Sequence, residues 1–227
     1  MKPALQNKAV ALFVRHPVPG QVKTRLARDI GNENACQFYQ AMVKDILCTI
    51  SSSHVPLYLF HDGSDSTGLP QPWLDAACSI VAQHGHTIGE RMTEAFKLLF
   101  SQNKQQVILL GSDIPGIETH MLLESFEILE SDDIAIVPAT DGGYCLIAIQ
   151  QTSFDDRIFQ DIEWSTERVL QTTLERIDEC GLRVTLLASR QDIDTCEDLQ
   201  TYSRKPAKSA HATNQWLIEK GYVCVSS

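Results

Sequence analysis

The sequence predicts a single α/β domain in which a mainly parallel sheet is covered by helices on both faces. Short apolar runs typical of buried strands alternate with amphipathic helical segments along nearly the whole chain, which is the pattern of a parallel sheet buried on both sides. The chain has 227 residues, 43% of them hydrophobic, enough to bury one sizeable core. We therefore expect residues 1–200 to form a three-layer α/β/α sandwich, followed by a C-terminal extension at residues 201–227.

The composition argues against several kinds of partner. The net charge is −10, so the field of the molecule would repel nucleic acid and anionic membrane surfaces. No run of about 18 apolar residues is present, and residues 1–8 are too polar and too short for a signal peptide. The cysteines form no CxxC pair and lie in apolar stretches, which predicts core residues rather than zinc ligands. We expect a cytoplasmic protein.

The first predicted βα unit contains a basic loop. Residues 8–15 form an apolar run that predicts a buried strand, and the prolines and glycine of HPVPGQVKTRL end it. Apolar residues then recur at helical spacing from Ala35 to Ile50, which predicts a long amphipathic helix. Residues 1–28 contain no acidic residue, so this segment should attract anions. Its basic residues are Lys2, Lys8, Arg15, Lys23, Arg25 and Arg28.

The alternation continues to the C-terminus. A polar loop at residues 61–72 is expected to lie on the surface. Gly181 suits a left-handed cap at the end of a helix, and Thr195-Cys-Glu-Asp198 resembles a capping box that opens a short helix. The predicted elements, in order, are strands at 55–60 and 78–82, a helix at 88–99, a strand at 107–110, a helix at 119–130, strands at 134–138 and 144–149, a helix at 165–180, a strand at 182–188, a short helix from 195, a connector at 203–213 and a last short helix with Trp216 and Leu217.

The basic loop has the features of a phosphate-binding segment. Prolines such as Pro19 restrict its backbone, Gly20 permits a close approach to a ligand, and Lys23 and Arg25 supply positive charge. The glycine that directly precedes the lysine of a Walker A motif is missing, which argues against an NTPase of that type. The alternative interpretation is a proline-stiffened connector whose basic side chains are merely solvated.

Three aspartates follow predicted strands. Asp113 ends the run VILLGSD, and ligands of open α/β sheets bind beyond the carboxyl ends of the strands. Asp192 and Asp194 follow the last predicted strand, where alternate residues of an extended segment could point to the same side. Because Mg²⁺ is commonly held by one or two carboxylates and substrate phosphates, Asp113 and one of the other two could form a metal site. Asp113 could instead cap a helix or turn, and Asp194 could simply begin the next helix.

Two further motifs contain candidate substrate-binding residues. The segment at 141–144 lies between two predicted strands and could be a hairpin turn alone or part of a binding site. Arg91 lies in the first turn of a predicted helix, where the helix dipole disfavours a positive charge. An anionic ligand would explain that position, and pairing with Glu90 or Glu94 would explain it equally well. The residues of the hairpin segment are Asp141, Gly142, Gly143 and Tyr144.

The ordered motifs FVRHPVPGQVKTRL, GHTIGERM, GSDIP, PATDGGYCLIAI, FQDIEWST and DIDTCEDL resemble the bacterial DUF2064 family. Proteins of this family are similar to glycosyltransferase-A enzymes, and some are linked to arsenosugar biosynthesis. The resemblance covers residues 9–200 and implies the nucleotide-diphospho-sugar transferase fold. That fold is shared with nucleotidyltransferases such as the enzyme that guanylylates 2-phospho-L-lactate, whose basic loop is similar to Lys23-Thr-Arg25.

The resemblance implies a role for each candidate residue. It assigns phosphate contact to Lys23 and Arg25, metal binding to Asp113 with Asp194 or Asp192, and the acceptor side to Asp141 and Tyr144. The sequence departs from the usual family pattern in having Arg15-His16 in place of Lys-Ala, Thr87 in place of Asp and Cys196 in place of Pro. Arg15 keeps the positive charge and remains a candidate for substrate binding.

Three functional hypotheses follow. The leading one is a transferase that uses Mg²⁺ or Mn²⁺ to bind a nucleotide-diphospho-sugar and passes its glycosyl group to a small-molecule acceptor. The second is nucleotidyl transfer, in which an acceptor phosphate attacks a nucleoside triphosphate and pyrophosphate leaves. The third is a non-catalytic module that binds a nucleotide as a signal. The C-terminal extension could pack on its own core or on the second subunit of a homodimer.

Overall fold

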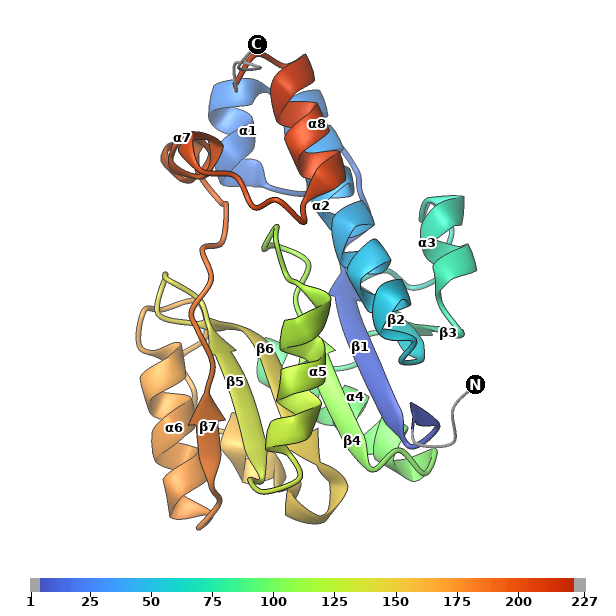
Figure 1. The fold of residues 1–227 in the computed structure, drawn as a ribbon, viewed down its shortest axis with the longest axis vertical. Coiled ribbons are helices and arrows are strands. Elements are labelled where there is room, and N and C mark those ends of the chain that lie inside the picture. Colours follow the sequence, from blue (N-terminus) through green and yellow to red (C-terminus); the bar gives the residue numbers. More distant parts are fainter. Residues whose placement is uncertain (1–4, 223–227) are drawn as a thin grey trace.

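The computed structural model describes residues 5–222 and contains a seven-stranded sheet between two layers of helices (Figure 1). The strands are β1 (Lys8–Val14), β2 (Leu57–His61), β3 (Ser79–Ala82), β4 (Gln106–Leu110), β5 (Ile134–Pro138), β6 (Tyr144–Gln150) and β7 (Val184–Leu186). They lie in the order β3-β2-β1-β4-β6-β5-β7. Only β6 runs antiparallel to its neighbours, β4 and β5. The predicted three-layer domain with a mainly parallel sheet is confirmed.

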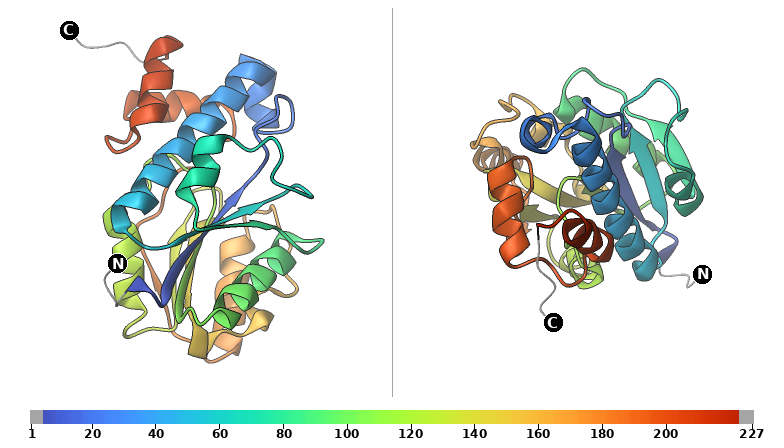
Figure 2. Two further views of the ribbon diagram at one scale, coloured as in Figure 1. Left: turned by 90° about the vertical axis from the view of Figure 1, so that its right-hand side faces the viewer. Right: turned by 90° about the horizontal axis from the view of Figure 1, so that it is seen from above.

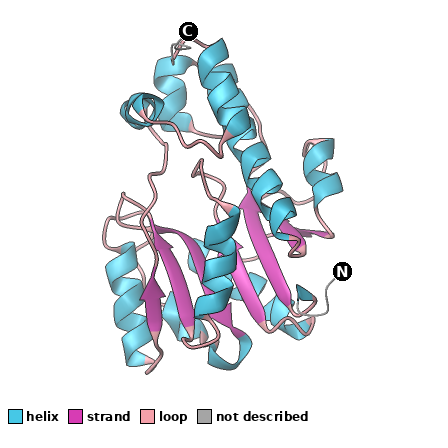
Figure 3. Ribbon diagram, in the orientation of Figure 1, coloured by secondary structure: helices cyan, strands magenta, loops and turns pink. Residues whose placement is uncertain are grey.

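The two helical layers cover opposite faces of the sheet (Figures 2 and 3). The helices are α1 (Thr24–Ile30), α2 (Asn32–Ser53), α3 (Gln71–Ala76), α4 (Ile88–Ser101), α5 (Thr119–Ile128), α6 (Val169–Glu179), α7 (Cys196–Arg204) and α8 (His211–Glu219), with 3-10 turns at Gln151–Ser153 and Asp156–Phe159. One core cluster contains residues of α2, α5 and α8, and the other contains residues of α4 and α6. No helix within residues 5–222 has the length and hydrophobicity needed to span a bilayer.

The central strands are apolar over most of their length because both of their faces are covered. On β1, the even-numbered residues from Val10 to Val14 belong to one core cluster, and the odd-numbered residues from Ala9 to Phe13 belong to the other. Successive side chains of a strand point to opposite faces, so a continuous apolar run supplies both cores. This arrangement leaves the ends of the strands, rather than their faces, for polar chemistry.

The short helix α1 lies in a segment that the sequence predicts as a loop, so that prediction was wrong for residues after Lys23. The surface loop expected at residues 61–72 is confirmed as far as residue 70, and the short helix α3 begins at Gln71. Helices this short do not repeat the apolar pattern often enough to reveal it. α6 begins at Val169 rather than at residue 165 because residues 164–168 form turns. The predicted capping box is confirmed, since the side chains of Thr195 and Asp198 each accept a hydrogen bond from the other's backbone N–H.

Only some of the described cysteines are core residues. Cys36 and Cys145 are buried as expected, but Cys48 and Cys78 are exposed, which contradicts the prediction for those two. Cys48 lies on the outward face of α2, where the helical period places it opposite the apolar stripe. Cys224 lies outside the described residues.

The described part of the C-terminal extension packs on its own chain. The Trp216 ring of α8 lies 5.0 Å from the ring of Phe38 on α2. The buried Asp45 carboxylate accepts hydrogen bonds from the backbone N–H groups of Ala212 (2.7 Å) and Thr213 (2.8 Å) at the start of α8. Asp45 therefore satisfies N–H groups that the helix itself leaves unpaired. Residues 223–227 of the extension lie outside the described residues.

Replacing Asp45 by alanine should lower the free energy of unfolding by about 1–3 kcal/mol, because two N–H groups at the start of α8 would lose their acceptor. Urea denaturation measures the change. Gln37→Ala, on the exposed face of α2, is the control and should stay within about 0.5 kcal/mol of the unmodified protein. Equal stability of the two variants would contradict this role of Asp45.

Candidate active site

The loop after β1 brings a lysine to the carboxyl end of the sheet. Its turn at residues 18–21 has Pro19 and Gly20 at the centre, and Gly20 has φ = 81°, a conformation that glycine adopts without strain. Both residues are exposed. Lys23 itself has a left-handed backbone, with φ = 47° and ψ = 45°, and immediately precedes α1. This conformation costs a non-glycine residue about 1–2 kcal/mol, so contacts elsewhere must hold Lys23 in place.

The ammonium group of Lys23 lies between two carboxylates. Its Nζ is 2.8 Å from Oδ1 of Asp113 and 2.8 Å from Oδ1 of Asp194. The side chain of Lys23 is 2% exposed, whereas those of Asp113 and Asp194 are 60% and 42% exposed. A buried ammonium needs such partners because an isolated charge is costly to remove from water. The lysine is thus enclosed, and the two carboxylates lie between it and solvent.

Three segments that are distant in sequence meet at this cluster. Asp113 follows β4, which pairs in parallel with β1, so Asp113 and the basic loop leave adjacent strands at the same edge of the sheet. The segment after β7 brings in Asp194, and the neighbouring Ile193 is fully buried, with its N–H directed at the Asp113 carbonyl at 3.4 Å. Sheet order and the anchoring of Ile193 therefore create the cluster.

The cluster shifts the ionisation of its members. Burial disfavours the charged form of Lys23, but Asp113 and Asp194 outweigh it and raise the pKa of the lysine above 10.5. Partial desolvation beside the enclosed lysine disfavours the charged form of Asp113, yet Lys23 lowers the pKa of that carboxyl below 3.8. Lys23 and Asp113 are therefore both charged at neutral pH.

A cavity of about 130 Å³ adjoins the cluster, and we call it the cationic cavity. Its lining residues are Arg15, Val22, Lys23, Thr24, Arg25, Tyr39, Asp113 and Asp194. The buried hydroxyl of Tyr39 accepts a hydrogen bond from the backbone N–H of Arg15 at 2.8 Å and lies 2.9 Å from Oγ of Ser112. Tyr39 therefore links the ends of β1 and β4. The structure brings together five of the predicted residues, namely Arg15, Lys23, Arg25, Asp113 and Asp194.

A second cavity of about 220 Å³, which we call the acidic cavity, shares Asp113 with the first. Its lining residues are Ile88, Met92, Gly111, Asp113, Ile114, Ala139, Asp141, Gly143, Tyr144, Cys145, Trp164, Ser165, Thr166, Val169 and Asp192. They come from the start of α4, the ends of β4 to β6 and the turn before α6. The two cavities are thus neighbours on either side of one carboxylate.

The structure does not bring Asp192 and Asp194 to the same cavity. Asp192 lines the acidic cavity, where burial, together with the charge of Asp141, raises its pKa above the ordinary value. The chain turns at Asp194, because the N–H groups of Asp194 and Thr195 both donate to Asp198 Oδ2, at 3.1 and 2.8 Å. The alternation of an extended strand therefore does not continue through these residues.

The segment at 141–144 is both a hairpin turn and a cavity wall. Asp141 Oδ1 accepts a hydrogen bond from the N–H of Gly143 at 2.9 Å, and Gly142 has φ = 90°. A Cβ atom on Gly142 would collide with the carbonyl of Glu167, so glycine allows the turn to pack against the segment before α6. Tyr144 lines the cavity, and its buried hydroxyl has no hydrogen-bond partner among the described residues.

Arg91 lines neither of these two cavities. Its Nε donates to the carbonyl of Gly85 at 3.1 Å, a local contact that differs from the ion pairs with Glu90 or Glu94 considered above. Glu90 instead accepts a hydrogen bond from the N–H of His86 at 2.7 Å. The position of Arg91 at the helix start therefore has a structural explanation in the Gly85 loop.

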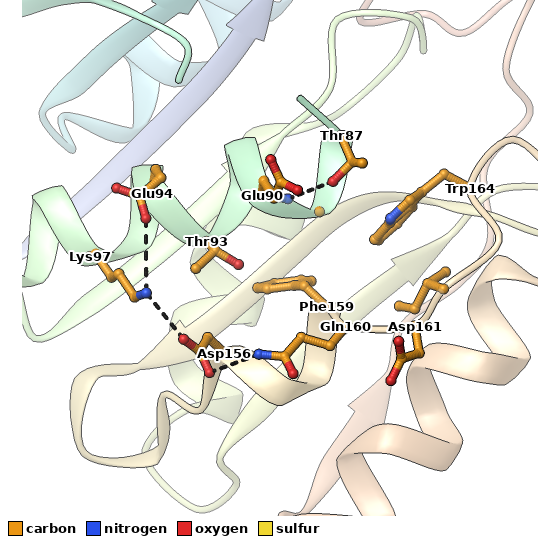
Figure 4. Close-up of a pocket in the computed structure, with 12 residues that line it drawn as sticks. Thr87, Glu90, Thr93, Glu94, Lys97, Asp156, Phe159, Gln160, Asp161 and Trp164 are labelled. Carbon is orange, nitrogen blue, oxygen red and sulfur yellow. Dashed lines mark hydrogen bonds and ion pairs between the residues drawn. The ribbon is translucent and has the colours of Figure 1, made fainter. Parts of the chain in front are cut away.

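A larger cavity of about 450 Å³ lies beside α4 and the turn at residues 156–162 (Figure 4). Lys97, the one basic side chain of the described residues that lines it, lies 3.8 Å from Glu94 and 3.1 Å from Asp156. Two carboxylates neutralise this ammonium and no arginine accompanies it, so this cavity is a poorer phosphate site than the cationic cavity, which Arg15 and Arg25 also line. Trp164 lines both this cavity and the acidic cavity.

Several residues of the site are not predicted by the sequence. The spacing of Tyr39 predicts only a place in the apolar stripe of a helix and gives no indication of its hydrogen bonds. The sequence predicts Trp164 and Thr166 at or before a helix start rather than in a cavity wall. A tryptophan followed by Ser-Thr in a turn is a weak indication of a binding surface, and only the packing of that turn against α4 assigns it to the cavity.

Asp113 and Asp194 have donor groups that suit Mg²⁺ or Mn²⁺. One carboxylate oxygen of each aspartate contacts Lys23. No protein donor within residues 5–222 contacts the second carboxylate oxygen of either aspartate. The described residues contain no group of three or more Asp, Glu, His or Cys side chains that could hold a metal. A cation here would therefore complete its shell with water and substrate phosphates, as Mg²⁺ commonly does.

Comparisons with known proteins agree with this fold. A candidate nucleotide-diphospho-sugar transferase from Desulfovibrio desulfuricans G20 has a similar structure, with a TM-score of 0.86, 31% identity and coverage of 96% of this chain and 99% of that one. A cytidylyltransferase from Leptospira borgpetersenii gives a TM-score of 0.57 at 11% identity, covering 97% and 98%. CMP:2-keto-3-deoxy-manno-octonic acid synthetase, solved with CTP, gives 0.52 at 11%, covering 86% and 95%. No curated protein matches the chain.

The fold is that of the structural class that includes a candidate nucleotide-diphospho-sugar transferase and cytidylyltransferases. Residues 47–166 match the DUF2064 family, described as uncharacterized proteins conserved in bacteria. The chain belongs to this family, and the resemblance found in its motifs is confirmed.

Replacing Lys23 by methionine should weaken the effect of acid on stability. In the unmodified protein the pKa of Asp113 is lowered, so the stabilisation from this pair is present above pH 3.8 and is lost as the pH falls below it. In the variant, Asp113 and Asp194 repel each other, and protonation relieves that repulsion. Urea midpoints near pH 7 and about pH 3 should therefore differ less in Lys23→Met.

The triple variant Lys23→Met, Asp113→Asn, Asp194→Asn is the control for this experiment, because it lacks every charge of the cluster and reports the acid response of the rest of the protein. The acid-induced drop in midpoint should be largest in the unmodified protein, intermediate in the triple variant and smallest in Lys23→Met. Identical drops in all three would contradict the ion pairing.

Proposed function

We propose that this protein transfers a glycosyl group from a nucleotide-diphospho-sugar to a small-molecule acceptor, with Mg²⁺ or Mn²⁺ as cofactor. The observation that carries the proposal is the cationic cavity, where Lys23 lies between Asp113 and Asp194 with Arg15 and Arg25 beside it. The cavity offers positive charge to phosphate oxygens and free carboxylate oxygens to a cation. A metal–diphosphate complex needs both.

The basic side chains would stabilise the leaving group. When the bond between the sugar and the β-phosphate breaks, negative charge accumulates on the nucleoside diphosphate, and positioned donors stabilise it. Lys23 is already fixed by two carboxylates, and the exposed Arg15 and Arg25 can each offer a fork of donors to phosphate oxygens. A divalent cation held by Asp113 and Asp194 would supply Lewis-acid stabilisation of the same charge.

The acidic cavity is the proposed site of the acceptor. It shares Asp113 with the cationic cavity, so an acceptor there would lie next to the diphosphate end of the donor. The hairpin at residues 141–144 forms one wall, which supports the assignment of Asp141, Gly143 and Tyr144 to the acceptor side. Gly142 contributes by allowing the turn to pack closely.

Nucleotidyl transfer is the second candidate, and one feature favours it. A lysine from the loop after β1 contacts a single aspartate at the end of β4, and the segment GSDIP lacks the Asp-x-Asp motif found in many glycosyltransferases. The solved cytidylyltransferase, at 11% identity, shares only its fold with this chain. In that reaction the same cluster would stabilise a nucleoside triphosphate, and pyrophosphate would leave.

Product analysis separates these functions. The purified protein is incubated with Mg²⁺ or Mn²⁺ and a set of nucleotide-diphospho-sugars and nucleoside triphosphates, with and without acceptors. Release of a nucleoside diphosphate from a nucleotide-sugar supports glycosyl transfer, whereas release of pyrophosphate supports nucleotidyl transfer. Tight nucleotide binding without turnover would favour a non-catalytic module and contradict both transferase proposals.

Replacing Asp113 by alanine should abolish metal-dependent nucleotide binding. The variant loses the carboxylate that lies between the two cavities, so added Mg²⁺ should no longer tighten binding, and the affinity in its presence should fall by about tenfold or more. Isothermal titration calorimetry with and without the metal measures this. Asp178→Ala, an exposed aspartate of α6, is the control, and unchanged metal dependence in Asp113→Ala would refute the metal assignment.

A further inference from the structure

The two cavities divide the charges of the site between them. The basic residues Arg15, Lys23 and Arg25 all line the cationic cavity. Within the described part of the chain, no lysine, arginine or histidine lines the acidic cavity, whose charged residues are Asp113, Asp141 and Asp192. Asp113 is paired with Lys23, whereas Asp141 and Asp192 form no ion pair with any residue from 5 to 222. The second cavity therefore has a net negative wall.

Basic residues that are close in sequence to the acidic cavity are directed elsewhere. Arg91 donates to the carbonyl of Gly85. The guanidinium of Arg190 donates to the carbonyl of Ser189 at 3.0 Å and lies 3.0 Å from the sulfur of Met121. Arg168 is exposed and does not line the cavity. No described cation is therefore in place to receive a phosphate or carboxylate group of an acceptor.

The remaining wall of the acidic cavity is largely apolar. Ile88, Met92, Trp164 and Val169 line it, and Ile88 is 39% exposed although it is a large apolar residue. Trp164 is closely packed, because a Cβ atom on Gly89 of α4 would lie 2.7 Å from its ring, and Figure 4 shows Trp164 beside the start of α4. A cavity lined by both apolar side chains and carboxylates suits a molecule with a C–H face and hydroxyl groups.

We infer that the acidic cavity selects an acceptor that offers hydroxyl groups and carries no phosphate or carboxylate, namely an uncharged polyol or sugar. This inference rests on the proposed function and specifies its acceptor. Carboxylates such as Asp141 and Asp192 accept hydrogen bonds from hydroxyl groups, but they repel a phosphomonoester, and like charges facing each other are an effective way to exclude a ligand. Donor phosphates bind on one side of Asp113, and acceptor phosphates are excluded on the other.

Matched acceptor pairs test the inference on the full-length protein with Mg²⁺ or Mn²⁺ and a set of nucleotide-diphospho-sugars. Suitable pairs are glycerol with glycerol 3-phosphate and glucose with glucose 6-phosphate, within a wider set of polyols, sugars and their phosphates. Release of nucleoside diphosphate is followed without acceptor and with each compound. We expect neutral compounds to accelerate release, and kcat/KM for their phosphates to be lower by about tenfold or more.

The outcomes separate this inference from the function on which it rests. Absence of nucleoside diphosphate release from every donor, with or without acceptor, would overturn the proposed function and the inference together. If the donor is hydrolysed but phosphorylated compounds are used as well as their neutral counterparts, only the inference fails. Donor hydrolysis that no neutral compound accelerates would also overturn the inference alone.

A single charge change provides the second test. Asp141→Asn keeps an oxygen that can accept the hydrogen bond from Gly143 and removes one negative charge from the cavity. The preference for neutral over phosphorylated acceptors should fall by about tenfold, and added salt should reduce the preference of the unmodified protein. The control is Asp65→Asn, an exposed aspartate outside both cavities whose carboxylate makes the same kind of contact with the N–H of Thr67. An unchanged preference in Asp141→Asn would overturn the inference.

Discussion

The contact of the buried Lys23 ammonium with Asp113 and Asp194 joins three parts of the chain on which the site depends. The left-handed backbone of Lys23 and the desolvation of its ammonium group are both unfavourable. Ion pairing with two carboxylates at 2.8 Å offsets them. Such ion pairs are a weak source of stability, but this one restricts the arrangement of the chain, because the enclosed ammonium would be left without a partner if both carboxylates moved away. The loop after β1, the end of β4 and the segment before α7 are thereby held in one geometry.

Helix α2 supports the same geometry through hydrogen bonds to the ends of two strands. Tyr39 on α2 contacts the backbone of Arg15 and the side chain of Ser112, so a single buried hydroxyl aligns the ends of β1 and β4. α2 is in turn covered by α8, through the ring contact of Phe38 with Trp216 and through Asp45 at the start of α8. α2 therefore contacts both the C-terminal helix and the backbone of Arg15 at the site.

Sheet topology explains why two cavities with different charges lie side by side. β1 and β4 are parallel neighbours, so their carboxyl ends supply the basic loop and Asp113. β6 is antiparallel and joined to β5 by the hairpin at residues 141–144, so a turn carrying Asp141 lies beside the end of β4. Cations thus gather on the β1 side of Asp113 and unpaired carboxylates on the β6 side. A transfer reaction between a charged donor and a neutral acceptor matches this division.

The sequence by itself determined the fold class, most of the long elements and the residue types of the basic loop, because apolar periodicity and backbone restriction by proline and glycine are local properties. Lys23, Arg25 and Asp113 could be singled out for the same reason, since each follows a recognisable strand. Only the tertiary structure decided that Lys23 is enclosed by Asp113 and Asp194, that Asp192 faces a different cavity, and that Tyr39 belongs to the site. Those contacts join residues that are far apart in the chain, and spacing along a sequence carries no information about which strand ends become neighbours.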